Sequence, residues 1–150
     1  MSRKTARAAA MQMIFEKTSG GQGGEETLQM IYDELRELPL PGDLSVDPDE
    51  PGSDDRAYIS TAFEGVTAHR EEIDAKIAKT AVGWTLDRMN LVDLTILRLA
   101  VWEILYAEKI PHSVSVAEAL ELIQQYSDPE DKAFVNGILG TIVREAESAR

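Results

Sequence analysis

Apolar residues recur mostly at helical spacing along this 150-residue chain. Hydrophobic side chains three and four positions apart mark one face of an α-helix, and the alternating β-branched runs of strands are scarce. The pattern predicts seven helices, over about 3–17, 25–38, 54–68, 71–82, 90–108, 115–126 and from 129 onward. Seven helices without a sheet predict an all-α bundle.

The segment 90–108 differs from the other predicted helices because it is apolar on most of its faces. Such a helix is typical of the buried centre of a bundle. Arg98 and Glu103 interrupt it, and buried charges need partners, so we expect both to pair, with Glu118 as one candidate. We also expect Trp84 and Trp102 to lie in the core.

Turn and cap signals set the predicted boundaries. Residues 39–53 hold four prolines and several acids, so we expect a mobile acidic loop there. Ser115 and Glu118 have the spacing of a capping box, and Asp128 before Pro129 is typical of a helix start. We expect a single domain made of two sub-bundles, over about 1–68 and 69–150.

Charge is distributed unevenly. The net charge is −12, yet residues 1–17 hold four cations and one acid. Arg3, Lys4 and Arg7 are three and four positions apart on one helical face, and phosphate binding would use them. Phe15 lies near the same face and could stack on an unpaired base. The alternative is a solvated N-terminus with Phe15 in the core.

Signals for catalysis or metal binding are missing. The chain has no cysteine, no phosphate-binding glycine loop and no metal-binding histidine pair. His69 and His112 are isolated, and the paired acids fall at predicted helix starts, where the helix dipole favours them. We therefore expect a protein that is not an enzyme and has no cofactor. No apolar run approaches a membrane span of ~20 residues, and no cleavable leader is evident, so we expect a cytoplasmic protein.

Three segments together resemble the NusB family. The first is RKTARAAAMQMIF, residues 3–15, with clustered basic residues before an alanine-rich helix. The second is WTLDRMNLVDLTILRLAVWEILY, residues 84–106. The third runs from Pro111 through VSVAEALEL, residues 114–122, to FVNGIL, residues 134–139. Their order and spacing are more specific than any one of them alone.

The resemblance implies a seven-helix fold of two packed helical sub-bundles without enzymatic activity. It implies binding of boxA-type single-stranded RNA together with the ribosomal protein NusE. The pair would reach RNA polymerase indirectly and support transcription of ribosomal RNA operons by preventing termination. The RNA-binding residues that it implies, all on one RNA-facing side, are Arg3, Lys4, Arg7, Gln12, Phe15, Lys132, Phe134 and Asn136.

The sequence also departs from the family pattern. Phe15 stands where tyrosine is common, Ala117 stands where asparagine is common, and the acidic segment 39–55 is an insertion. One alternative is a NusB-like helical interaction module without RNA binding of its own. Another is the accessory module of an RNA-modifying enzyme, although this chain has no cofactor loop. A homodimer also stays open.

Overall fold

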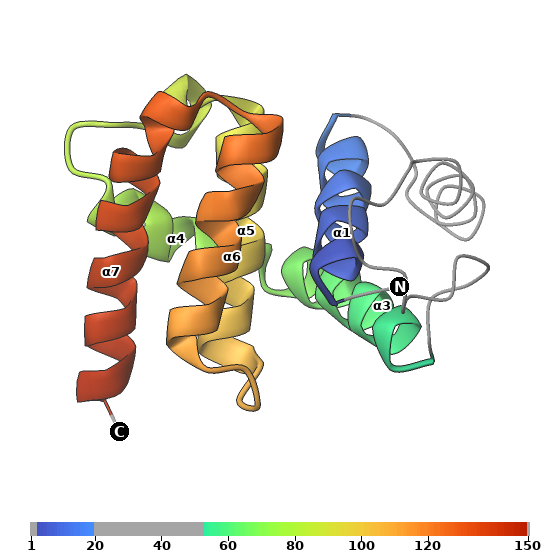
Figure 1. Cartoon of the computed structure of the whole chain (residues 1–150). Coiled ribbons are helices and arrows are strands. Elements are labelled where there is room, and N and C mark those ends of the chain that lie inside the picture. The colour runs from blue at the N-terminus through green and yellow to red at the C-terminus, as the bar shows by residue number, and fades with distance from the viewer. Residues whose placement is uncertain (1–2, 20–52, 150) are drawn as a thin grey trace. The chain divides into compact units, whose positions relative to one another are not determined.

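The computed structural model describes residues 3–19 and 53–149. These residues form α1 (Arg3–Thr18), α3 (Ser53–Ala68), α4 (Arg70–Thr80), α5 (Leu91–Tyr106), α6 (His112–Tyr126) and α7 (Lys132–Ser148) (Figure 1). Two short 3-10 helices, η1 (Leu86–Arg88) and η2 (Pro129–Asp131), precede α5 and α7. This part of the chain contains no strand, which confirms the all-α class with six α-helices. The helix predicted over 25–38 and nearly all of the loop predicted over 39–53 lie outside the described residues.

The chain divides into two units, residues 1–64 and 65–150, and the boundary falls inside α3. In the first unit the apolar stripe of α1 is buried, as its spacing predicts. Its members are Ala6, Ala9, Ala10, Met13 and Ile14. On α3, Ile59 and Ala62 are fully buried. Five charged residues make α1 polar overall, although its alanine-rich stripe forms a core face.

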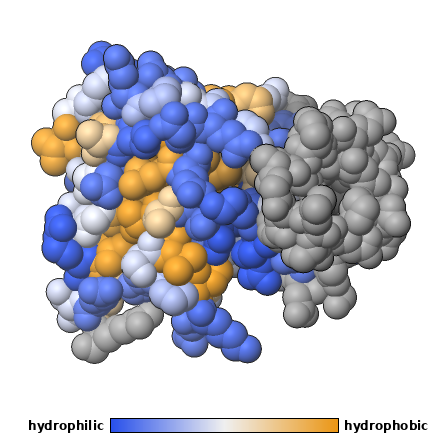
Figure 2. Space-filling view, viewed as in Figure 1, coloured by the Kyte–Doolittle hydropathy of each residue, from blue (hydrophilic) through white to orange (hydrophobic). Residues whose placement is uncertain are grey.

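The second unit is built around α5, which contacts α4, α6 and α7 (Figure 1). Every residue of α5 from Asp93 to Ile104 is buried. Asn90 caps the helix by accepting a hydrogen bond from the Val92 amide at 2.8 Å. The prediction of a central buried helix is therefore confirmed. Figure 2 shows an apolar band flanked by polar residues on the face formed by α6 and α7.

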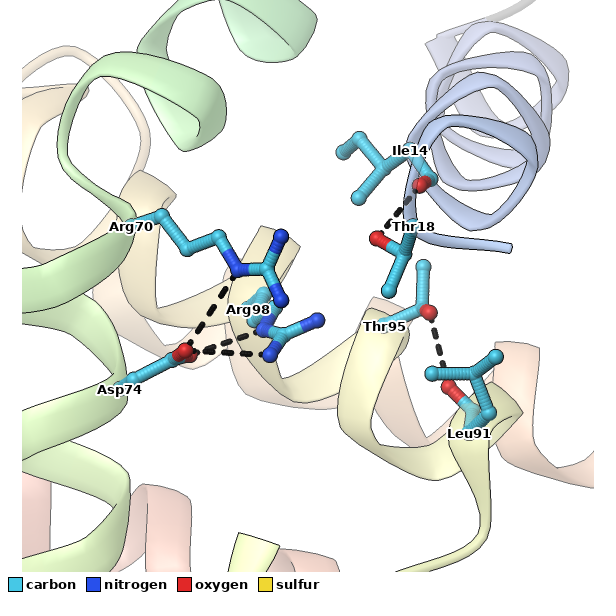
Figure 3. A network of polar contacts seen from close by, with 7 residues as sticks. All are labelled: Ile14, Thr18, Arg70, Asp74, Leu91, Thr95 and Arg98. Carbon is cyan, nitrogen blue, oxygen red and sulfur yellow. Dashed lines mark hydrogen bonds and ion pairs between the residues drawn. The ribbon is translucent and has the colours of Figure 1, made fainter. Parts of the chain in front are cut away.

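Arg98 and Glu103 inside α5 both have partners, but not the ones that spacing suggested, and among the described residues the Arg98 Nη1 is buried without a hydrogen-bond partner. Arg98 donates to both carboxylate oxygens of Asp74 on α4, at 2.8 and 3.0 Å, and Arg70 lies 3.6 Å from the same carboxylate (Figure 3). Glu103 accepts a hydrogen bond from Ser115 at 2.8 Å. The expectation that buried charge is paired is confirmed for Arg98, whose partner is Asp74 and not the candidate Glu118.

The role of Ser115 differs from the prediction too. The helix α6 begins at His112, three residues before the expected cap, and Ser115 is buried inside its first turns. Its hydroxyl is used by Glu103, because a buried carboxylate needs a donor more than a solvated helix start does. Asp128 does act as a cap: it accepts from the Glu130 amide at 3.0 Å and starts η2.

The two tryptophans lie in different environments. Trp102 on α5 is 5% exposed, as expected for a core residue. Gly65 on α3 faces it so closely that a Cβ there would lie 2.0 Å from the indole Nε1. Trp84, between α4 and η1, is 51% exposed, so its prediction as a core residue is wrong. It follows Gly83, whose φ of 85° turns the chain away from α4.

Candidate nucleic-acid interface

The basic end of α1 presents two exposed cations, Arg3 and Lys4. No acid lies in the first turn of α1, so the helix dipole opposes these charges there. Arg3 is held from α3 instead. Its Nε lies 3.1 Å from the Asp55 carboxylate, and its guanidinium lies 4.8 Å from the centre of the Tyr58 ring. The side chain is 42% exposed and remains accessible to an anion.

Arg7 behaves differently from its two neighbours. Only 5% of it is exposed, and its guanidinium lies 5.8 Å from the centre of the Tyr58 ring, which is itself buried. The prediction that Arg3, Lys4 and Arg7 form one exposed basic face is therefore wrong for Arg7. Packing against the Tyr58 ring outweighs the preference of the Arg7 guanidinium for water. The aliphatic part of an arginine side chain is apolar, and its planar guanidinium is only weakly hydrated.

The other two predicted residues of α1 lie further along the helix. Gln12 and Phe15 are both half-buried, so each reaches solvent with part of its side chain. The Phe15 carbonyl accepts the Ser19 hydroxyl at 2.8 Å, which closes the end of the helix. The Phe15 side chain is therefore partly buried and partly exposed to solvent.

The start of α7 carries the remaining predicted residues. Lys132 is its first residue, Phe134 is half-buried, and Asn136 is exposed one half-turn later. The structure thus brings these three together within five residues of one helix. Gly137 follows, and a Cβ there would meet nothing within 4 Å.

A buried carboxylate anchors the turn in front of α7. Asp93, in the first turn of α5, accepts a hydrogen bond from the Ser127 hydroxyl, and the Asp131 carboxyl is a neighbour that acts on its pKa. Burial, followed by the neighbouring carboxyls of Asp131 and Asp128, raises the pKa of Asp93 to about 6, against a lowering by the Ser127 hydroxyl.

An aromatic contact beside α7 was missed by the sequence analysis. The ring centres of Trp84 and Phe134 are 5.5 Å apart, and their planes are inclined by 57°. The signal in the sequence was the glycine before Trp84, which breaks the helical period and turns the residues that follow outward.

The structure offers no sign of a catalytic or metal centre among its described residues. No group of histidines and acids there could hold a metal ion. His69 stacks on Tyr106 with ring centres 4.2 Å apart. The Nδ1 of His112 lies 3.2 Å from the Glu147 carboxylate, near the end of α7. Tyr106 donates to Glu72, which raises the pKa of the tyrosine to about 12. In the same residues, no helix has the length and apolar character needed to cross a membrane.

These features describe an all-helical protein with basic residues at the start of α1 and basic, aromatic and amide residues at the start of α7. The sequence model of the NusB family matches residues 4–144. The chain therefore belongs to the NusB family. This is a family of transcription antitermination proteins rather than enzymes, which confirms the expectation of a non-enzymatic protein.

Named relatives match over nearly their whole length. The transcription antitermination protein NusB of Clostridium botulinum is 37% identical over 146 residues, which is 95% of this chain and 100% of the relative. That of Symbiobacterium thermophilum is 36% identical over 149 residues, 99% of this chain and 94% of the relative. Both relatives carry no large segment that this chain lacks.

Solved structures share the fold. T. maritima NusB superposes with a TM-score of 0.76 at 27% identity, covering 97% of this chain and 92% of that one. A structure of the antitermination factors NusB and NusE in complex with dsRNA gives a TM-score of 0.76 at 24% identity, covering 95% and 96%. The second likeness supports the fold alone.

Proposed function

We propose that this protein is a transcription antitermination factor that binds boxA-type RNA together with NusE and supports transcription of ribosomal RNA operons. The observation that carries the proposal is the family match over residues 4–144, which spans both units. A relative of the same fold has been solved with NusE and dsRNA, which identifies the kinds of partner to test.

Within this proposal the RNA contacts come from two helices. On α1 they are Arg3, Lys4, Gln12 and Phe15, and on α7 they are Lys132, Phe134 and Asn136. Arg7 acts indirectly, because its guanidinium is packed against Tyr58 and helps to hold α1 on α3. We infer the complete fold to be seven helices in two packed sub-bundles, acting in the cytoplasm and reaching RNA polymerase through NusE.

The charge of the protein makes its RNA affinity conditional. Only Arg3, Lys4 and Lys132 are cations of the proposed interface, on a chain of net charge −12. Each phosphate neutralised on single-stranded RNA contributes about −0.7 to the slope of log affinity against log salt, so three contacts give about −2. A basic partner would be attracted to the acidic surface and would add phosphate contacts of its own.

The deciding experiment titrates a boxA-type RNA with the full chain, with and without NusE, from low to moderate salt. We expect weak binding with a slope of about −2 alone, and tighter binding with a steeper slope in the presence of NusE. Equal affinity and equal slope in both series would contradict the conditional binding. Absence of RNA binding in both series would instead favour the alternative of a helical interaction module. Sedimentation of the free protein tests the homodimer separately.

A further inference from the structure

Trp84 occupies a position that the core does not explain. It is 51% exposed, and its neighbour Val82 is 88% exposed, in the connection between α4 and η1. This connection projects from its unit in Figure 1, and apolar surface appears at the same edge in Figure 2. Large apolar side chains left in water at one turn commonly mark a binding surface.

The turn holds the indole in a defined place. The Trp84 amide donates to the Ala81 carbonyl at 3.0 Å, and the Arg88 amide donates to the Thr85 carbonyl at 3.0 Å. Gly83, at a φ of 85°, supplies the left-handed residue that this path needs. Trp84 is therefore presented by hydrogen-bonded backbone on both sides rather than by a loose chain.

The partner ring supports Trp84 without covering it. Phe134 meets it at 5.5 Å between ring centres with the ring planes inclined by 57°, a tilted rather than a parallel arrangement. An inclined neighbour does not occupy the indole as a parallel ring would, so a flat ligand can still stack on it. One turn after Phe134, Gly137 leaves the helix surface bare, with nothing within 4 Å of its missing Cβ.

The charges around this surface favour stacking over phosphate binding. Lys132 and Asn136 flank Phe134 on α7, while Glu130 and Asp131 precede them and Asp87 and Arg88 lie in η1. The mixture is close to neutral, so it does not neutralise phosphates strongly. Aromatic surfaces that bind bases need little charge, since every base has a flat face.

We propose that Trp84, supported by Phe134, is a base-stacking residue for single-stranded RNA, with the open helix surface at Gly137 admitting the adjacent nucleotide. This inference rests on the proposed function and adds to it a residue outside the predicted RNA-binding set. The ligand is an unpaired nucleobase. A protein segment and a second copy of the chain are the competing occupants, and the test separates them.

The probe is an unstructured boxA-type RNA added to the full-length protein, alone at low salt and again with NusE. Trp84→Ala should weaken binding in both series by about 5- to 150-fold, the range that ~1–3 kcal/mol per stacked base represents. Trp84→Phe should recover most of the affinity, because a ring remains. The salt slope should stay the same, because no phosphate contact is removed.

Val114→Ala is the matched control, because it removes an exposed apolar side chain from α6, rather than from the turn that holds Trp84, without removing a ring. It should leave the RNA affinity unchanged. Fluorescence gives a second readout. Trp102 is buried, so the change in emission on adding RNA should come from Trp84 and should be absent in Trp84→Phe.

Three results would overturn the inference while leaving the proposed function in place. The first is wild-type affinity of Trp84→Ala for RNA. The second is a loss confined to the series with NusE, which would assign the indole to a protein contact. The third is a Trp84→Ala protein that sediments differently from the wild type while its RNA affinity is unchanged, which would assign the indole to a contact with a second copy of the chain. Failure of the wild-type protein to bind RNA in either series would overturn the proposed function as well.

Discussion

The surroundings of Trp102 and those of Trp84 contrast within one unit. Trp102 lies in α5 and is buried, and the lack of a side chain at Gly65 leaves room for its indole. Trp84 lies at a turn and is half exposed, and Gly137, one helical turn after its partner Phe134, leaves space that nothing fills. A tryptophan and a glycine thus serve core packing around Trp102 and, in our proposal, the access of a nucleobase to Trp84.

The largest effect on stability is expected from Asp74→Ala, which removes the partner of the buried Arg98 on α5. This change leaves the guanidinium of Arg98 buried without its carboxylate, since Arg98 is only 3% exposed. Removing one partner of a buried ion pair costs roughly 3–5 kcal/mol, so the free energy of unfolding in urea should fall by that amount. Glu71→Ala, an exposed acid of the same helix, is the control. A loss below ~1 kcal/mol would show that Arg98 is solvated.

Gly65→Ala tests the enclosure of Trp102 directly. A Cβ at 2.0 Å from the indole Nε1 cannot be accommodated without moving the ring or α3. Overpacking of this kind costs typically about 1–3 kcal/mol, and the melting temperature should fall accordingly. Restoring space with Trp102→Leu in the same chain should recover part of the loss. A stable Gly65→Ala protein would mean that the two helices separate there readily.

The stability of the protein is expected to depend on pH through Asp93, which holds the turn in front of α7. Its pKa of about 6 in the folded protein lies above the ordinary value of 3.8, so the folded state binds more protons between these values. Asp93 should therefore contribute most stability below about pH 4 and lose it as pH rises through about 6. Asp93→Asn should flatten this part of the stability profile and raise stability near pH 7 by roughly 1–2 kcal/mol, less than two full pKa units would give. An unchanged profile would show that Asp93 is ionised throughout.

Gly137→Ala sharpens the contrast between the two glycines. Alanine is favoured over glycine inside a helix by about 1 kcal/mol, and here it meets no neighbour, so the protein should become more stable by up to that amount. RNA affinity should fall at the same time, because the new methyl group occupies the open surface. Thermal melting and RNA titration of one preparation check both signs. Greater stability with full RNA affinity would show that nothing approaches this glycine.

The smallest effect on stability is expected from the joint change Arg3→Gln and Lys4→Gln. Both residues are exposed and unfavourably placed in the helix dipole, so unfolding should shift by less than ~1 kcal/mol. RNA affinity and the salt slope should both decrease. Lys17→Gln, an exposed cation at the other end of α1, is the matched control. Arg7→Gln should instead destabilise the protein, and stability equal to wild type would contradict its packing on Tyr58.

Periodicity was sufficient to predict the helices that the structure describes, but not the surroundings of single side chains. The spacing of apolar residues gave α5 as the central helix and the alanine face of α1 as buried, because both depend only on local repeats. The partners of Arg98 and Glu103 come from α4 and α6, at distances along the chain that no local pattern encodes. Arg7 and Trp84 were misplaced for the same reason: burial of an amphipathic side chain depends on which surface another helix brings to it. The proposed RNA residues of α7 came from family resemblance, and geometry added Trp84 to them.

The stacking of Arg3 on Tyr58 has a thermodynamic consequence for anion binding. A free arginine side chain carries about 2 kcal/mol of rotamer entropy, which is lost when it is fixed on a ligand. The Asp55 carboxylate and the Tyr58 ring already restrict the guanidinium before any phosphate arrives. Part of the ordering cost is thereby met during folding, and the phosphate has to compete with one carboxylate for an arginine that is already in place.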